Sequence, residues 1–286
     1  MANKKTYQKV LAIESSTSLC SVALKVGIDV GGSRLSKDVL ISKDVSISND
    51  VPISKEVQIS KDAPISKDVP TVGVGEASRV TMNALPGEIL ELHTNALGKH
   101  SSAIFMHTRD LLEAAGLRFS DLDAIVLGGG PGSYTGLRVA ASAVKGMLFG
   151  LDVPLFLGNT LAGFALGLEG IQRPQRIHSI IDARRKHVYH QEFEVLGGTT
   201  EISKLGEASI IEIDHVNDRF RSGDRLVGTG IERLDNNRLP DIQTHSIEET
   251  SAAGLIRLLD IGSDQLIQEV DVADFEPMYA VTESVR

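Results

Sequence analysis

Residues 122–149 read LDAIVLGGGPGSYTGLRVAASAVKGMLF, and this stretch decides the fold. The aliphatic run Leu122–Leu127 predicts a buried strand, the glycines after it a tight turn, and Tyr134–Phe149 a helix. A strand that passes through such a turn into a helix is typical of α/β proteins. No Gly-Lys-Ser/Thr follows, and the third glycine of a dinucleotide motif arrives one residue late. A structural turn is therefore favoured over a phosphate site.

The predicted helix is apolar around most of its circumference. Leu137, Val144 and Met147 form a core stripe, while small uncharged residues occupy much of the surface between Gly136 and Gly146. A helix of this kind is normally buried on two sides. One side is expected to face its own sheet. The other faces a neighbouring domain or a second polypeptide, and the second polypeptide is slightly favoured.

The N-terminal strands are separated by a repetitive segment. Val10–Ile13 and Cys20–Lys25 are predicted to form a hairpin, and Gly87–His93 the next strand. Between them, six hexapeptides of the type SKDVxI occupy residues 36–71. Six repeats would make about two coils of a β-helix, below the usual three repeats for stability. Alternating Lys and Asp, with interspersed Pro, instead favour a low-complexity insert at about 28–86 that is disordered, exposed and dispensable.

The second half of the chain restarts the same pattern. A hairpin is predicted from 177–181 and 187–195, joined by a charged turn, and a helix from Ser251–Leu259 that continues to Ile267. Two α/β units result, each beginning with a β-hairpin. The predicted domains are residues 1–160 and 161–286.

Composition limits the function classes. The 286 residues include 29 basic and 38 acidic side chains, a net charge of −9, which disfavours a chain that grips nucleic acid alone. The single cysteine, Cys20, excludes an internal disulfide and a multi-cysteine zinc site, and a buried position is expected for it. His100 and His107 would lie about 10 Å apart on a helix, too far to chelate one ion. Without a membrane span or a signal-peptide core, a cytoplasmic protein is expected.

Two polar turns carry alternative interpretations. Glu14–Thr17 suits a loop that binds Mg²⁺ and phosphate, but a polar hairpin turn is favoured. Asp182–Lys186 could meet a nucleotide phosphate or an acidic partner, and a solvated hairpin tip is an equally good interpretation.

Several segments together resemble the TsaB family, formerly YeaZ. They are VLAIESSTSLCSVAL (10–24), residues 100–116, GGGPGSYTGLRVA (128–140) and IDARRKHVYHQEF (181–193). The resemblance covers nearly everything except the insert. It implies an α/β protein with the actin-like ATPase (ASKHA) fold, made of two ribonuclease H-like units, with the hexapeptide insert in the N-terminal hairpin.

The resemblance also implies a function in tRNA modification. TsaB is the non-catalytic scaffold and dimerisation subunit that supports TsaD, which threonylcarbamoylates N6 of adenosine 37 in tRNA. TsaD binds its metal through a His-x-x-x-His pair. Here His100 is followed by Ile104, an aliphatic residue that cannot ligate a metal. We therefore expect a catalytically inactive paralogue. The alternatives are an actin-like nucleotide-binding ATPase and, remotely, a metallopeptidase-like protein.

Partners and sites follow from the same resemblance. The expected partners are TsaD, the P-loop ATPase TsaE and, without TsaD, a second copy of the chain. tRNA is reached only through the complex, no membrane is involved, and no metal or other cofactor is required, although the partner interface could hold ATP or ADP. The expected interface residues are Ile104, His107, Leu111, Gly132, Ser133, Tyr134, Thr135, Arg138, Ala141 and Lys145. Glu14, Ser15, Ser16 and Thr17 would be a relic of a nucleotide site, and Asp182, Arg184 and Arg185 a family signature turn.

Overall fold

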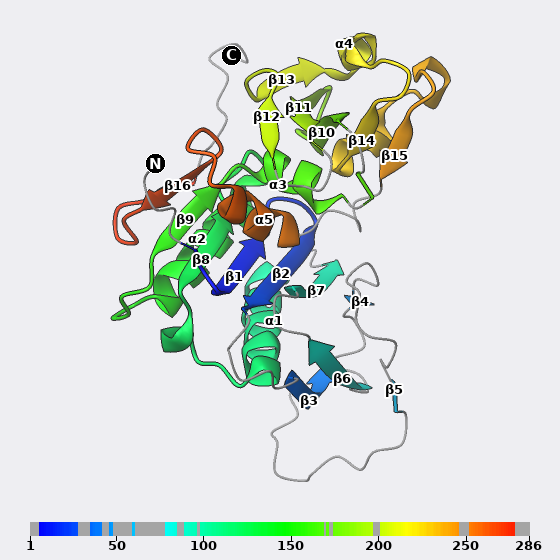
Figure 1. Ribbon diagram of the computed structural model, residues 1–286. Helices are drawn as coiled ribbons and strands as arrows, with labels where there is room; N and C mark the ends of the chain where they lie inside the picture. The colour runs from blue at the N-terminus through cyan, green and yellow to red at the C-terminus, as the bar shows by residue number, and fades with distance from the viewer. Residues whose placement is uncertain are drawn as a thin grey trace.

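The computed structural model describes residues 6–27, 35–41, 46–47, 59–60, 78–84, 89–95, 98–168, 170–171, 174–196, 201–245 and 252–277. Within these ranges the strands form sheets of seven, six and three strands (Figure 1). Helices lie on the two larger sheets, so the architecture is the mixed α/β type expected from the sequence.

The first sheet contains the predicted N-terminal hairpin and the predicted strand that precedes the glycine-rich turn. Its strands are β1 (Lys9–Glu14), β2 (Leu19–Val26), β4 (Ser46–Ile47), β7 (Ile89–Asn95), β8 (Ala124–Gly128), β9 (Leu155–Gly158) and β16 (Ile267–Val270), in the order β16-β9-β8-β1-β2-β7-β4. β1 pairs antiparallel with β2 and parallel with β8, which pairs parallel with β9. Every residue of β8 is buried, as its aliphatic sequence predicts.

Two helices cover one face of this sheet. They are α1 (His100–Ala115) and α2 (Tyr134–Met147), and their aliphatic faces join the core formed with β1, β2 and β8. Gly116, with φ of 67°, ends α1, because glycine adopts the left-handed conformation without steric cost. Ser133 caps α2 by accepting a hydrogen bond from the amide of Gly136 at 3.3 Å. None of the helices in the described ranges has the length and apolarity to cross a membrane.

The second sheet confirms the second predicted hairpin. Its strands are β10 (Gln175–Asp182), β11 (His187–Val195), β12 (Ile202–Lys204), β13 (Ser209–Glu212), β14 (Arg225–Val227) and β15 (Gln243–His245). The order is β12-β11-β10-β14-β15, and β13 also pairs with β11. Short helical turns join its outer strands: η2 (Asn217–Arg219), η3 (Thr229–Arg233), η4 (Asn236–Arg238) and α4 (Ile213–Val216). η1 (Phe119–Asp121) precedes β8 in the first unit.

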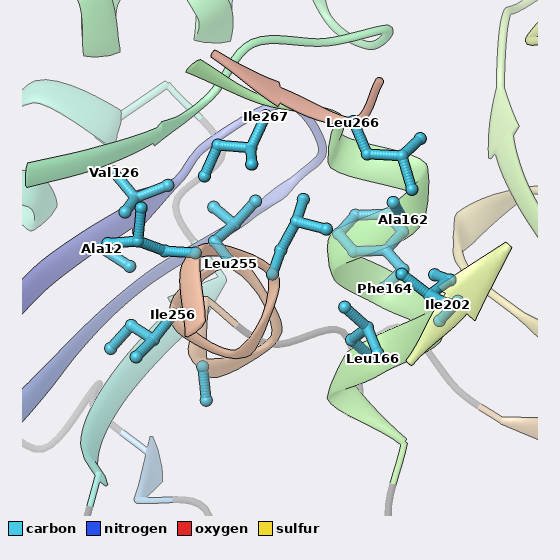
Figure 2. Close-up of a cluster of buried hydrophobic side chains, with 14 of the residues drawn as sticks. Ala12, Val126, Ala162, Phe164, Leu166, Ile202, Leu255, Ile256, Leu266 and Ile267 are labelled. Carbon is cyan, nitrogen blue, oxygen red and sulfur yellow. The ribbon is translucent and has the colours of Figure 1, made fainter. Parts of the chain in front are cut away.

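Two apolar helices join the sheets. α3 (Thr160–Gly167) packs on β10 and β11, α5 (Ala253–Ile261) packs on β1, β2 and β8, and the helices pack on each other (Figure 1). One hydrophobic core therefore runs from Ala12 and Val126 of the first sheet, through Leu255 and Phe164, to Ile202 of the second (Figure 2). Packing of this kind makes the two units depend on each other for stability.

The end of the chain differs from prediction. The helical continuation expected up to Ile267 is wrong, because Gly262 takes a left-handed conformation (φ 64°) and ends α5. Ile267–Val270 instead forms β16, which pairs antiparallel with β9. The division at residue 160 therefore does not follow the sheets, since the second predicted domain returns a strand to the first sheet.

The segment between β2 and β7 forms strands where the structure describes it. β2 and β7 pair antiparallel from Leu19↔Asn95 to Lys25↔Ile89. Within the intervening segment, β3 (Leu35–Ile41) and β5 (Ile59–Ser60) pair antiparallel with β6 (Ser78–Ala84), while β4 pairs with β7. These strands differ from the disorder that we expected, and their antiparallel pairing differs from a β-helix. β3 lies against α1 (Figure 1). Most of the hexapeptides lie outside the described residues.

Candidate functional site

The turn Glu14–Thr17 is closed by bonds within the chain. The buried Glu14 carboxylate accepts the amide of Ser16 at 2.7 Å and the Thr160 hydroxyl at 3.0 Å. Burial raises the pKa of Glu14, and these hydrogen bonds oppose the shift. Burial, together with the charge of Glu14, also raises the pKa of the Cys20 thiol to about 12, in keeping with the buried position predicted for it. Both carboxylate oxygens of Glu14 are thus engaged by the protein itself.

The glycine-rich turn between β8 and α2 packs closely against the Glu14–Thr17 turn. The amide of Ser133 donates to the carbonyl of Ser16 at 2.6 Å. A Cβ at Gly128 would overlap the Glu14 carboxylate, one at Gly132 the Ser16 side chain, and one at Gly136 the Ser15 carbonyl oxygen. The chain's own β1–β2 turn therefore makes the close approach that glycines permit. This favours the structural interpretation of GGGPGSYTGLR over phosphate binding.

Replacing Gly136 by alanine is expected to lower the free energy of unfolding by about 2 kcal/mol, because the backbone of α2 or of the Glu14–Thr17 turn must move to make room for the Cβ. A Cβ at this position would also lie 3.3 Å from the Ser15 carbonyl carbon. Gly206→Ala is the matched control, since open space surrounds that position. Urea unfolding of the two variants measures the difference. A Gly136→Ala protein as stable as the control would contradict the close approach.

The histidine at the start of α1 contacts the same turn. Nδ1 of His100 lies 2.9 Å from the Ser15 hydroxyl oxygen, and burial lowers the pKa of His100. One turn later, the fully buried Ile104 joins the hydrophobic core. The second position of the transferase-type His-x-x-x-His pair is therefore an aliphatic residue that faces inward.

Four predicted interface residues face the core instead. Ile104, His107, Leu111 and Ala141 are 6% exposed or less. They lie on the faces of α1 and α2 that pack on the sheet or on each other, so their assignment as partner contacts is wrong for this conformation. Neither ring nitrogen of His107 has a hydrogen-bond partner, and burial, with a contribution from His93, lowers its pKa to about 4.

The other predicted interface residues lie at or near the surface. Tyr134, Thr135 and Arg138 are exposed, and the Arg138 guanidinium lies 5.1 Å from the Tyr134 ring centroid and donates to its hydroxyl. Gly132 and Ser133 are half-buried. Lys145 is held by the C-terminal segment, since its Nζ donates to the Ala273 carbonyl at 2.8 Å and lies 4.8 Å from the buried Phe275 ring.

Sequence reasoning missed two exposed aromatic residues. Phe105 of α1 is 50% exposed, and Phe149, just beyond α2, is 90% exposed. The helical period could have identified Phe105, because it lies opposite the core stripe of α1, whereas Phe149 lies beyond the end of α2. We refer to the three exposed aromatic residues Phe105, Tyr134 and Phe149 as the aromatic surface.

The signature turn joins β10 to β11. Oδ1 of Asp182 accepts the Arg184 amide at 2.7 Å and the Arg233 guanidinium at 2.6 Å. The Arg233 guanidinium also donates to the Arg185 carbonyl, and the Asp182 amide donates to the Thr229 hydroxyl at 3.0 Å. The structure thus brings Asp182, Arg184 and Arg185 together, with η3 supporting the turn.

A buried polar chain in the second sheet was not predicted. Nε2 of His178 lies 3.0 Å from Asp224, and its Nδ1 lies 2.9 Å from Nε2 of His190. Burial lowers the pKa of His178, and burial with the charges of His178 and Arg219 lowers that of His190 to about 3. The three residues come from separate segments, so no local spacing reveals them. Within the described ranges, no group of three His, Cys, Asp or Glu side chains is arranged to hold a metal.

Comparisons with known proteins agree with this fold. Residues 94–228 match the family model "TsaD: tRNA N6-adenosine threonylcarbamoyltransferase". The "tRNA threonylcarbamoyladenosine biosynthesis protein TsaB" of Haemophilus influenzae is 31% identical over 106 residues, 37% of this chain and 45% of that protein. The Escherichia coli protein of the same name is 31% identical over 96 residues, 34% of this chain and 42% of that protein. The chain thus spans about half the length of the curated relatives it matches.

A solved structure extends the likeness to the whole fold. "YeaZ from Pseudomonas aeruginosa" superposes with a TM-score of 0.59 at 22% identity, over 95% of this chain and 99% of that chain. The two mixed sheets, the family model and this neighbour support an actin-like α/β fold. In sequence the chain is thus similar to TsaB proteins over about a third of its length, and in fold it is similar to YeaZ.

Proposed function

We propose that this chain is a non-catalytic subunit of tRNA threonylcarbamoyladenosine biosynthesis that binds and supports the TsaD transferase. The names of its relatives and the transferase-type family model support this proposal. The observation that carries it is Ile104. Where the resemblance to TsaD requires a second metal-binding histidine, this chain has a fully buried aliphatic side chain.

The aromatic surface is the proposed contact with TsaD. Large exposed aromatic residues are enriched at protein interfaces, where each contributes much of the binding energy. Phe105 lies on α1 and Phe149 just beyond α2, while Tyr134, Thr135 and Arg138 are exposed in the first two turns of α2. Self-association through the same surface in the absence of TsaD, and the joining of TsaE to the complex, belong to the proposal. The proposal also includes a cytoplasmic location. It further includes an ATP or ADP at the interface, although this chain does not require one.

A nucleotide-hydrolysing function has less support. It would place Glu14 at a metal–phosphate site, yet both oxygens of that carboxylate bond within the chain. ATP turnover that Glu14→Ala abolishes would favour this alternative.

The double variant Phe105→Asp/Phe149→Asp is expected to weaken association with TsaD by at least about tenfold, because two apolar anchors become charged. Size-exclusion chromatography with light scattering, on the chain alone and mixed with TsaD of the same organism, measures this. Leu205→Asp is the control, since Leu205 is 46% exposed but belongs to the second unit. If the unaltered chain fails to bind TsaD at micromolar concentrations, with and without ATP, the partner assignment is wrong.

A further inference from the structure

Two adjacent arginines at the tip of the β10–β11 hairpin hold an unfavourable backbone conformation. Arg184 has φ of 67° and Arg185 φ of 54°, and no other non-glycine residue of the described ranges has positive φ. Positive φ is uncommon for residues other than Gly, Asn and Asp, and here two adjacent arginines adopt it. Strain of this kind persists where the surrounding structure fixes it, and it gathers at functional sites. The arginines therefore need a reason other than turn formation.

The hydrogen bonds that fix the turn use the backbone of these residues and not their side chains. Asp182 accepts the Arg184 amide, and Arg233 donates to the Arg185 carbonyl. The His187 amide donates to the Arg184 carbonyl at 3.2 Å, and the Ala183 amide to the His187 carbonyl at 3.1 Å. Asn and Gly would preserve all four bonds. The two guanidinium groups are thus not what holds the turn.

The tip carries positive charge that no described residue pairs. Arg184, Arg185 and Lys186 are exposed, and none of them has an ion pair with a described residue. The nearby carboxylate of Asp182 is already paired with Arg233. These three adjacent cations therefore form a local basic patch on a chain whose net charge is −9. Guanidinium groups match the geometry of phosphate oxygens through paired N–H donors.

We propose that this tip contacts the phosphodiester backbone of the RNA substrate within the assembled complex. The inference rests on the proposed function, which brings a tRNA to the assembly. A local contact also agrees with the overall charge, because the acidic remainder of the chain opposes RNA binding by the isolated protein. The turn fixes the backbone at both arginines before the RNA arrives, so no backbone entropy is lost at the tip on binding.

The test is the double variant Arg184→Asn/Arg185→Gly in complex with TsaD. Fluorescence anisotropy with labelled tRNA, at a series of salt concentrations, is expected to show severalfold weaker binding. The slope of log K against log salt should become shallower by about 2, one for each lost phosphate contact. The melting temperature of the variant chain should rise by a few degrees as strain is released. A purely structural role for the arginines predicts the opposite shift in melting temperature.

Two controls separate the possible outcomes. Arg184→Lys/Arg185→Lys retains the charge and is expected to retain most of the salt slope, while Arg118→Asn removes an exposed arginine beside η1 and should leave binding unchanged. Complex formation is followed by size-exclusion chromatography. If the complex forms and both arginine-free and unaltered forms bind tRNA equally, the inference is wrong. Loss of TsaD or TsaE binding would assign the tip to an acidic protein surface and also overturn it. Failure of the unaltered chain to bind TsaD would contradict the proposed function instead.

Discussion

Replacing Gly254 by alanine is expected to lower the free energy of unfolding by about 3 kcal/mol, because α3 and α5 cross with their backbones in contact. A Cβ at this position would overlap the carbonyl oxygen of Gly163 and lie 2.8 Å from the Gly167 amide nitrogen. Neither neighbour is a side chain that could rotate away. Because α3 packs on the second sheet and α5 on the first, separating the helices strains the core that joins both.

Gly146→Ala is the matched control for Gly254. It is also a helical glycine, but open space surrounds it, so alanine should be neutral or stabilising by up to about 1 kcal/mol. Urea unfolding followed by circular dichroism gives the midpoint and slope for each variant. Gly254→Ala is also expected to make the transition less cooperative, as the two units lose their shared core. A change within about 0.5 kcal/mol of the control would mean that the helices do not cross this closely.

The sequence predicts the parts of the fold that local chemistry decides. Alternation and aliphatic runs identify β1, β2, β8, β10 and β11. Pairing between distant segments is not encoded locally. Ile267–Val270 is a short run whose strand character depends on β9, more than 100 residues earlier, and a helical continuation was an equally good local interpretation.

The candidate sites also include features that local sequence decides and features that packing decides. The turns Glu14–Thr17 and Asp182–Lys186 could be located from the sequence, because polar residues between strands predict turns. The burial of individual interface candidates on α1 and α2 was not given by the family resemblance that suggested them, because packing decides which side chains are covered. Ile104, His107 and Leu111 therefore faced inward against expectation. His190 and its neighbour His178 lie on different strands of the hairpin, so no local spacing along the chain pairs them.

The buried histidines are expected to make the protein strongly acid-labile below about pH 6.5. In the chain Asp224–His178–His190, neutral His178 donates from Nε2 to Asp224 and accepts the Nε2–H of His190 at Nδ1. A proton added to His178 would make its Nδ1 a donor, so His190 would have to change tautomer to accept it. His107 offers no partner to a proton at either ring nitrogen. All three rings are therefore held neutral by the fold.

The direction of the pH effect follows from the lowered pKa values. With pKa values of about 3 for His190 and about 4 for His107 in the folded state, and ordinary values when unfolded, the unfolded chain binds more protons below pH 6.5. Stability is then fully present above pH 6.5 and falls as pH drops toward the folded pKa values. Each histidine contributes about 1.4 kcal/mol per pH unit, so these two alone give about 3 kcal/mol per unit. Glu14 and Asp110 act in the opposite sense, because burial raises the pKa of each carboxyl.

Chemical unfolding between pH 4.5 and 8 measures this slope, and His107→Leu tests its origin. Leucine removes a buried polar ring that has no partner, so the variant should be at least as stable at pH 8 and should lose about 1.4 kcal/mol per pH unit of the acid slope. His215→Leu replaces a histidine whose side chain is 72% exposed and should leave the slope unchanged. If the unaltered chain keeps a flat profile down to pH 5, the imidazoles must reach solvent or a partner in the folded state. An altered slope in the His215 variant alone would place the acid sensitivity at the surface and not in the two cores that enclose these histidines.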